Sequence, residues 1–330
     1  MIIKRGLPIR CYFTFVFALA FMGCAFFWFI STYQISIKPL FKINEILIGD
    51  KGRLIDLENF TFILNHDMCK KTQPFLLIMV HTAPKNLEKR NAIRETWGQV
   101  SSSVITVFLV GWSEKDQINI LTENFKYGDI IQGNFVDSYR NLTYKHVMAL
   151  KWFTYYCSNA KYILKLDDDV FVNIAAVLDY LNYLPPLVTR SFIICNPQIR
   201  MPVLRGNSTK WGVSFKEYPA SYYPKYCSGW AVFYSPDSAI LLYRQAQNES
   251  YFWIDDVHVT GTIASKVNVT ILSFRSLMLS FEEQNYILHN STCFKKFLFG
   301  SLNLQPNVVR SLHSIVSRCS VMSDHKFVKI

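Results

Sequence analysis

An α/β fold, in which helices cover a sheet of largely parallel strands, is predicted by three features of the sequence. Short apolar runs alternate with longer amphipathic stretches through the first half of the chain, which is the order of repeated strand–helix units. The apolar runs are bounded by turn residues and have the length of buried strands. Half of the 330 residues are hydrophobic and 15% are aromatic, so the chain can build a large core.

The expected elements begin at residue 75 and follow one another closely. Buried strands are expected at 75–80, 104–111, 129–132 and 161–166. Helices are expected at 87–99, 114–125, 138–157 and 173–184. In the long helix 138–157, the side chains expected to face the core are Leu142, Val147, Leu150 and Phe153. Right-handed crossovers would join these strands in parallel, whereas the pattern after residue 192 is mixed, with a helix at 236–247.

Residues 11–30, CYFTFVFALAFMGCAFFWFI, are almost wholly apolar. Twenty helical residues span about 30 Å, the thickness of a bilayer core. Lys4, Arg5 and Arg10 precede this segment and favour a cytoplasmic N-terminus. We predict a cytoplasmic tail at 1–10, a transmembrane signal-anchor at 11–30, a stem at 31–72 and a lumenal domain at 73–330. A cleaved signal peptide is the alternative, because Ala18 to Ala20 could form a cleavage site.

Sequons and cysteines agree with a non-cytoplasmic location of that domain. Six candidate N-glycosylation sites follow the apolar segment and none precedes it: Asn59, Asn141, Asn207, Asn248, Asn268 and Asn290. Six cysteines also follow it: Cys69, Cys157, Cys195, Cys227, Cys293 and Cys319. This even number suits an oxidising compartment, but the spacing does not assign the pairs.

The formal net charge of +11 favours anionic ligands but does not select among them. It fits diphosphates, acidic glycans or a membrane surface. The sequence has no long Lys/Arg run beside stacked aromatic residues, so nucleic acid is not an expected partner.

Three consecutive carboxylates, Asp167, Asp168 and Asp169, follow the expected strand 161–166. Adjacent like charges repel one another, and a divalent cation such as Mg²⁺ or Mn²⁺ would offset that cost. Ligands of α/β sheets also tend to bind at the carboxyl ends of strands. The triplet therefore suggests a metal–diphosphate site for a nucleotide-sugar donor, with a solvated polar turn as the alternative.

Two arginines, Arg90 and Arg94, lie four residues apart and would share one helix face. Two guanidinium groups on one face could grip a diphosphate, although a solvated basic face would have the same spacing. Further along, Asp137 and Lys145 place a carboxylate and an amine near a helix start.

Five segments, taken in order, resemble the β-1,3-galactosyltransferase family of inverting glycosyltransferases, which also includes β-1,3-N-acetylglucosaminyltransferases and Fringe-type enzymes. The segments are RNAIRETWG at 90–98, the stretch 134–145, the Asp triplet with VFVN, YCSGW at 226–230 and WIDDV at 253–257. The resemblance covers roughly residues 74–265. It implies a GT-A-type, Rossmann-like mixed sheet, UDP-sugar donors, usually Mn²⁺, and a single-pass type II location in the Golgi membrane.

The resemblance also implies roles for individual residues. Metal binding falls to Asp167 and Asp169, and donor binding to Arg90, Arg94, Asp137, Lys145, Asp167 and Asp168. The acceptor side is implied to include Trp230, Trp253 and Asp255. Asp256 would be the general base that takes the acceptor hydroxyl proton in a single inverting displacement. The expected reaction moves galactose from UDP-galactose to the 3-hydroxyl of an acceptor sugar on a glycoprotein or glycolipid.

This sequence departs from the family pattern at three places. Trp230 follows Gly229 where many members have a second glycine, and Asp255 stands where Glu is more common. No His stands shortly before Pro306, where the family commonly has a metal-binding His. The alternatives are a β-1,3-N-acetylglucosaminyl- or N-acetylgalactosaminyltransferase, a catalytically weak member of the family, or a glycan-binding or chaperone-like pseudoenzyme that kept the fold. A Ca²⁺-binding lectin would not need the arginine segment.

Overall fold

A mixed sheet of eight strands forms the centre of the described structure, in the order β10-β8-β9-β7-β4-β5-β6-β3. The computed structural model describes residues 52–70, 72–184, 190–206 and 209–320. The predicted tail, the predicted anchor and most of the predicted stem lie outside these residues. None of the helices in the described part combines the length and hydropathy that a membrane crossing requires.

The four strands expected in the first half of the chain are all present and pair in parallel. They are β4 (Leu76–His81), β5 (Val104–Trp112), β6 (Ile130–Val136) and β7 (Tyr162–Asp167). Strand β6 runs beyond the expected end at residue 132, because Trp112 of β5 also pairs with Val136 across a register shift. Every residue of β4 is buried, so this strand has helices or other strands on all sides.

The strands of the second half make the sheet mixed, as the family resemblance implied, and not wholly parallel. Strand β9 (Tyr226–Tyr234) lies antiparallel between β7 and β8 (Phe192–Gln198), and β10 (Thr270–Ser273) pairs in parallel with β8. At the other edge, the short β3 (Phe62–Leu64) is antiparallel to β6. An antiparallel β9 brings its first residues to the carboxyl end of β7.

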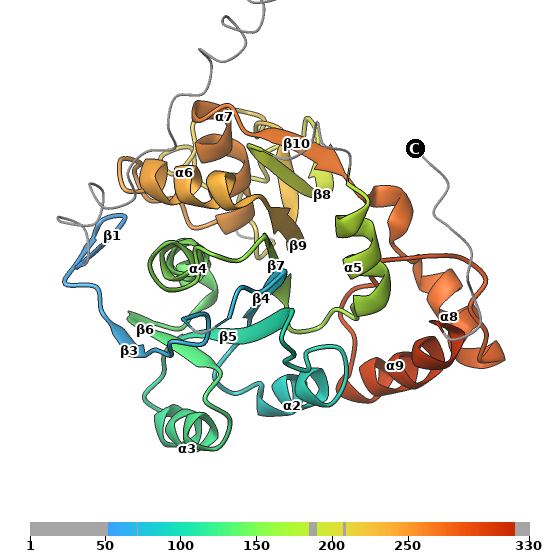
Figure 1. Cartoon of the computed structure of the whole chain (residues 1–330). Coiled ribbons are helices and arrows are strands. Elements are labelled where there is room, and N and C mark those ends of the chain that lie inside the picture. The colour runs from blue at the N-terminus through green and yellow to red at the C-terminus, as the bar shows by residue number, and fades with distance from the viewer. Residues whose placement is uncertain (1–51, 71, 185–189, 207–208, 321–330) are drawn as a thin grey trace, which may run out of the picture. The chain divides into compact units, whose positions relative to one another are not determined.

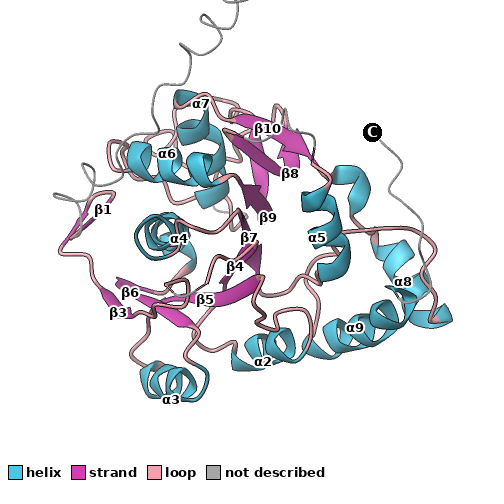
Figure 2. Ribbon diagram, in the orientation of Figure 1, coloured by secondary structure: helices cyan, strands magenta, loops and turns pink. Residues whose placement is uncertain are grey.

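Helices cover both faces of the sheet (Figure 1, Figure 2). In the view of Figure 1, α4 (Leu142–Tyr156) lies above β5 and β6, and α2 (Leu87–Glu95) and α3 (Gln117–Tyr127) lie below them. The other helices of the described residues include α5 (Ile174–Asn182), α6 (Pro236–Ala246), α7 (Ala264–Lys266), α8 (Phe281–Asn290) and α9 (Pro306–Ser320). A π-helix at Val257–Ile263 directly precedes α7.

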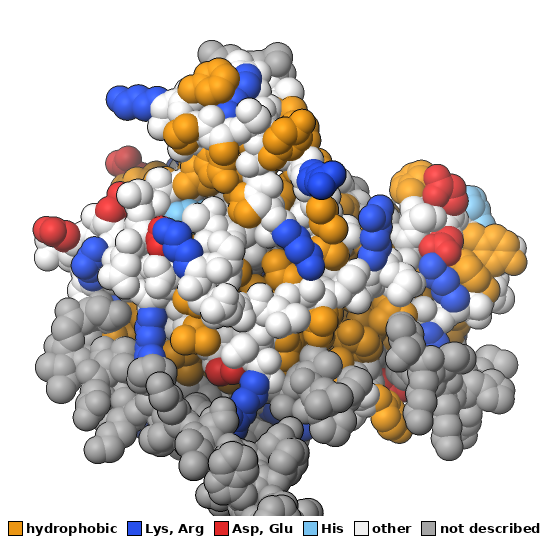
Figure 3. Space-filling view, turned by 90° about the horizontal axis from the view of Figure 1, so that it is seen from above, with side chains coloured by type: hydrophobic (Ala, Val, Ile, Leu, Met, Phe, Trp, Pro, Cys, Tyr) orange, Lys and Arg blue, Asp and Glu red, His pale blue; other side chains and the backbone are white. Residues whose placement is uncertain are grey.

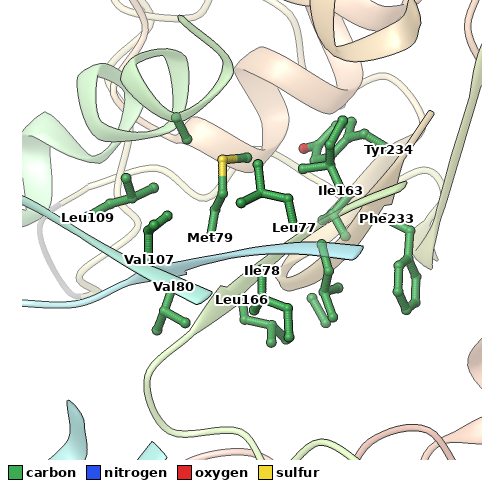
Figure 4. Packing of buried hydrophobic residues seen from close by; sticks show 14 of the residues in the cluster. Leu77, Ile78, Met79, Val80, Val107, Leu109, Ile163, Leu166, Phe233 and Tyr234 are labelled. Atoms are coloured by element: carbon green, nitrogen blue, oxygen red, sulfur yellow. The ribbon is translucent and has the colours of Figure 1, made fainter. Parts of the chain in front are cut away.

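The core consists of side chains that alternate between the two faces of the sheet. In Figure 4, Leu77 and Met79 of β4 point to one side, and Ile78 and Val80 point to the other. All four are fully buried. Burying one such side chain stabilises the fold by roughly 1.5–3 kcal/mol relative to exposing it.

Helix α4 differs from the amphipathic helix expected at 138–157. A short 3-10 turn at Tyr139–Asn141 precedes it, and every residue from Thr143 to Thr154 is buried. The helix packs against α6 as well as the sheet, so even its polar residues, Lys145, His146 and Lys151, are inside the protein. This burial carries ionisable side chains into the molecule's interior.

The folded unit begins before residue 73, the start expected from the sequence. The hairpin of β1 (Arg53–Leu54) and β2 (Leu57–Glu58) precedes β3, which joins the central sheet. Three disulfides join Cys69 to Cys157, Cys195 to Cys227, and Cys293 to Cys319. The first of them ties the segment before β4 to the end of α4.

Candidate active site

A cavity of about 770 Å³ opens at the carboxyl ends of β4 and β7. The last residues of these strands, His81 and Asp167, are paired in register and both line it. The first half of β9 and the segment 253–257 line other sides. Segments that are more than 150 residues apart in the printed sequence therefore meet around one space.

The middle carboxylate of the triplet points into the protein. Asp168 is 8% exposed and accepts hydrogen bonds from Thr82 Oγ1 (2.6 Å), Asn86 Nδ2 (2.8 Å) and Lys89 Nζ (2.9 Å). It is not among the residues that line the cavity. In this structure Asp168 holds the end of β7 to the loop after β4, and its predicted contact with the donor remains a prediction.

The outer carboxylates, Asp167 and Asp169, both line the cavity. Lys165 Nζ lies 2.9 Å from Asp167 Oδ1, and Lys89 Nζ lies 3.2 Å from Asp169 Oδ2. The side chains of Asp167 and Asp169 are 43% and 27% exposed, so a ligand in the cavity can reach them.

These two carboxylates offer the oxygen ligands that a hard divalent cation prefers. Within the described ranges, no group of three or more His, Cys, Asp or Glu is placed to hold a metal ion. The cavity wall shortly before Pro306 consists of Leu302 and Asn303. Two carboxylates do not make a closed metal site, so a metal bound to Asp167 and Asp169 would need further oxygen ligands from outside the protein, such as those of a diphosphate.

A second pair of carboxylates, Asp255 and Asp256, lines the same cavity just before the π-helix. Burial would raise the pKa of Asp255, but the hydrogen bond from His146 and the charge of Lys165 outweigh burial and lower it. Burial and the negative charge of Asp255 raise the pKa of Asp256 to about 7. One of the two carboxyl groups is therefore ionised near neutral pH, and the other exchanges its proton there.

The buried Lys165 connects the two pairs of carboxylates. Its ammonium contacts Asp167 Oδ1 and donates to the carbonyl oxygen of Gly229. Burial disfavours the charge of Lys165, but Asp167 and Asp255 outweigh burial and raise its pKa. A fixed positive charge thus lies in the cavity wall among carboxylates.

The two arginines predicted to grip a diphosphate do not line the cavity. Arg90 is fully buried, and its guanidinium donates to both Glu123 oxygens, to Thr82 Oγ1 and to two backbone carbonyls, which engages all five of its N–H groups. Arg94 pairs with Glu123 and Asp129. The physical reason is that α2 turns this face toward Glu123 of α3 and Asp129, which directly precedes β6, so both arginines have protein partners.

Asp137 and Lys145 come together, but beneath the cavity rather than in its wall. Their side chains are 8% and 3% exposed and form an ion pair of 2.8 Å. Asp137 also accepts from the Gly111 N–H (2.6 Å), and Lys145 donates to the Thr82 carbonyl (2.6 Å). The pair therefore joins the carboxyl ends of β4 and β5 to α4.

The two tryptophans expected on the acceptor side both line the cavity, although each is largely buried. Trp230 packs edge to face against Phe274 and Phe299. The Arg140 guanidinium lies 4.4 Å from the ring centre of Trp253, whose buried indole N–H has no hydrogen-bond partner. Trp230 is thus fixed by core contacts, whereas Trp253 keeps a free donor.

Two residues that line the cavity, His81 and Lys165, escaped the sequence analysis. So did Lys89 and His146, which contact the lining residues Asp169 and Asp255. Lys165 precedes the Asp triplet by two residues on a strand, so its side chain shares the face of Asp167 and could have been found. His146 lies on a helix that was predicted to be amphipathic without assigning it a role, and only the fold brings it to Asp255.

The predicted N-glycosylation sites fall mostly on the surface. Asn59, Asn248, Asn268 and Asn290 are exposed. Asn141 is half-buried and donates to the Val136 carbonyl (2.8 Å). Asn207 lies outside the described residues. In Figure 3, Lys and Arg side chains are spread between hydrophobic ones over the face shown and do not form one basic run.

Comparisons with known proteins agree with this site. A sequence model of the family described as galactosyltransferase matches residues 88–275. Human UDP-GalNAc:beta-1,3-N-acetylgalactosaminyltransferase 1 is 36% identical over 225 residues, which are 65% of this chain and 67% of the relative. Mouse beta-1,3-galactosyltransferase 1 is 35% identical over 216 residues, 63% of this chain and 66% of the relative.

A third relative is named for a different transferred sugar, N-acetylglucosamine. Lactosylceramide 1,3-N-acetyl-beta-D-glucosaminyltransferase of Xenopus tropicalis is 32% identical over 253 residues, 72% of this chain and 67% of the relative. The matched residues include the Asp triplet, the Asp255–Asp256 pair and the strands β7 and β9, whereas β4 precedes them. The chain belongs to the galactosyltransferase family of β-1,3-glycosyltransferases.

Proposed function

We propose that the protein transfers galactose from UDP-galactose to the 3-hydroxyl of an acceptor sugar on a glycoprotein or glycolipid, on a GT-A-type fold held in the Golgi membrane by its N-terminal segment. The observation that supports it most is the position of Asp255 and Asp256 in the same cavity as Asp167 and Asp169. Transfer of N-acetylgalactosamine or N-acetylglucosamine is the second candidate, because relatives of similar identity carry those names.

In the proposed mechanism, Asp256 removes the proton from the acceptor hydroxyl while its oxygen attacks the anomeric carbon. The bond from that carbon to the UDP oxygen breaks, and UDP leaves with the electron pair. Attack from the opposite face converts an α-linked donor into a β-linked product. Asp167 and Asp169 would hold Mn²⁺, which when bound neutralises the diphosphate. Asp255, held ionised, keeps the proton affinity of Asp256 high enough for a base at neutral pH.

The pH dependence of transfer is expected to follow Asp256. Its pKa of about 7 predicts that kcat/KM falls below neutral pH, because the protonated carboxyl group cannot accept the hydroxyl proton. Asp255→Asn removes the neighbouring negative charge, so the pKa of Asp256 falls and the acid limb moves to lower pH. A pH profile of kcat/KM for both proteins measures this shift. An unchanged acid limb in the variant would contradict the coupling of the two carboxylates.

Gly229→Ala is expected to lower kcat roughly 3- to 10-fold, because it would displace Asp256 by a few tenths of an ångström. A Cβ at Gly229 would lie 3.0 Å from Asp256 Cβ and 3.5 Å from its Oδ2. Gly52→Ala is the matched control, since nothing lies within 4 Å of a Cβ there. Steady-state kinetics of both variants, with their melting temperatures, separate displacement of the base from loss of fold. Equal kcat values in the two variants would show that the close approach of residue 229 to Asp256 does not affect catalysis.

The function itself is tested with the full-length chain in detergent. UDP-galactose, UDP-N-acetylgalactosamine and UDP-N-acetylglucosamine are offered with simple sugar acceptors, in Mn²⁺ or in EDTA. Transfer from UDP-galactose that EDTA abolishes, with a β-1,3 linkage in the product by NMR, is the expected result. Preference for another donor would establish the second candidate. Failure with every donor, together with measurable UDP binding, would favour a non-catalytic, glycan-binding role.

A further inference from the structure

His146 lies inside α4, fully buried, between a strand of the sheet and the carboxylate pair. Its Nε2 is 2.8 Å from the hydroxyl of Tyr234 on β9, and its Nδ1 is 2.9 Å from Asp255 Oδ2. The imidazole therefore bridges the core of the sheet and the cavity wall.

The hydrogen-bonding partners determine which nitrogen carries the proton. Burial lowers the pKa of His146, so the imidazole is neutral at pH 7 and carries one N–H. The ionised Asp255 can only accept a hydrogen bond, so Nδ1 must be the donor. Nε2 then accepts from Tyr234, whose pKa burial raises well above its ordinary value, so that the phenol keeps its proton. In this one arrangement both ring nitrogens of His146 have a partner, Asp255 Oδ2 and the Tyr234 hydroxyl.

Few other charged groups could fix Asp255 in place of His146. From β7, Lys165 faces Asp255, but its ammonium is already in contact with Asp167 and the Gly229 carbonyl. From β4, the His81 ring lies edge to face with His146 at 5.4 Å between ring centres, and burial lowers the pKa of His81 well below its ordinary value. Among the described residues, His146 is the side chain that donates a hydrogen bond to the Asp255 carboxylate, and the backbone N–H of Asp256 donates to it as well.

Asp256, the next residue, is held by a different hydrogen bond, which does not involve His146. Asp256 accepts from the Val257 N–H (2.8 Å) at the start of the π-helix. The two carboxylates are consecutive, so a movement of Asp255 changes both the backbone that carries Asp256 and the charge beside it.

We propose that His146 is a positioning residue for the transfer: its Nδ1–H holds the Asp255 carboxylate in place, and thereby sets the position and charge environment of Asp256. This role rests on the proposed function of Asp256 as the base. His146 touches neither donor nor acceptor, since it does not line the cavity.

Two amide variants separate the two hydrogen bonds of His146. In His146→Asn, the side-chain N–H stands close to the place of Nδ1 and can still donate to Asp255. In His146→Gln, the longer amide reaches the place of Nε2 and serves Tyr234 instead. We expect His146→Asn to keep most of kcat and His146→Gln to lose roughly 10- to 100-fold, with the KM for the UDP-sugar unchanged in both. Melting temperatures identify any variant that does not fold.

His258→Asn is the control for removing a buried imidazole, because His258 is 3% exposed and its Nε2 has no hydrogen-bond partner. Its kcat is expected to stay near that of the unaltered chain. Equal losses in His146→Asn and His146→Gln would overturn the role proposed for Nδ1, since a merely structural imidazole does not distinguish them.

The tautomer provides a readout without turnover. In protein labelled with ¹⁵N-histidine, the resonances that disappear in His146→Asn are expected to show a protonated Nδ1 and an unprotonated Nε2. The opposite tautomer would overturn the proposal even if transfer is active. Absence of transfer by the unaltered chain with every donor would instead overturn the proposed function, and the tautomer would still report the Asp255 contact.

Discussion

Asp256→Asn is expected to lower kcat by roughly 10²- to 10⁴-fold, the usual contribution of a positioned general base. Asparagine has nearly the same shape as aspartate, and its amide oxygen can still accept from the Val257 N–H. The amide cannot take the acceptor proton at any pH. The variant should therefore fold and bind UDP normally but transfer sugar very slowly. Rapid-mixing or long-endpoint assays measure kcat, and calorimetric titration measures UDP affinity.

Asp67→Asn is the matched control for this change. Asp67 has a side chain that is 60% exposed and pairs with Lys70 three residues along the chain, away from the cavity. An exposed ion pair of this kind contributes little to stability, so the kcat of Asp67→Asn should equal that of the unaltered chain. Retention of more than a tenth of kcat in Asp256→Asn would mean that another group takes the proton. Asp255 would then be tested next, since it lines the same cavity.

The order of strands and helices in the first half of the chain could be predicted from the sequence, because buried parallel strands are continuous apolar runs. Strand β4 shows this clearly, since Leu76 to Val80 is an unbroken apolar run and every residue of it is buried. The position of β9 in the sheet could not be predicted from apolar runs. Its insertion between β7 and β8 depends on pairing across long sequence separations, which leaves no local pattern.

The candidate site also has residues that the sequence identified and residues whose role it did not predict. The family resemblance drew attention to Asp255 and Asp256, and the structure places both in the cavity wall with Asp167 and Asp169. The pattern around Arg90 suggested a ligand contact, but helical spacing says only which residues share a face, not what that face meets. In the fold it meets Glu123, so the charge is satisfied inside the protein.

Arg90→Met is expected to destabilise the protein by about 3–5 kcal/mol, the usual cost of breaking a buried ion pair by removing one partner. Arg90 and Glu123 have side chains that are 1% and 3% exposed, and they lie 2.6 Å apart at their closest atoms. Methionine fills much of the space but leaves Glu123 with Arg94 as its remaining ionic partner. The lost stability should appear as a lower denaturant concentration at the midpoint of unfolding. The folded protein should keep its affinity for UDP.

The double variant Arg90→Met/Glu123→Leu removes both members of the pair. Glu123 Oε2, which loses its 2.6 Å donor in the single variant, is then absent, and Arg94 keeps Asp129 at 2.8 Å. It is expected to recover a large part of the lost stability, because replacing a buried pair with apolar groups is often near neutral. A stable Arg90→Met variant with weakened UDP binding would give the opposite answer. It would show that Arg90 leaves Glu123 to bind the diphosphate, and that the donor rearranges the loop between β4 and α2.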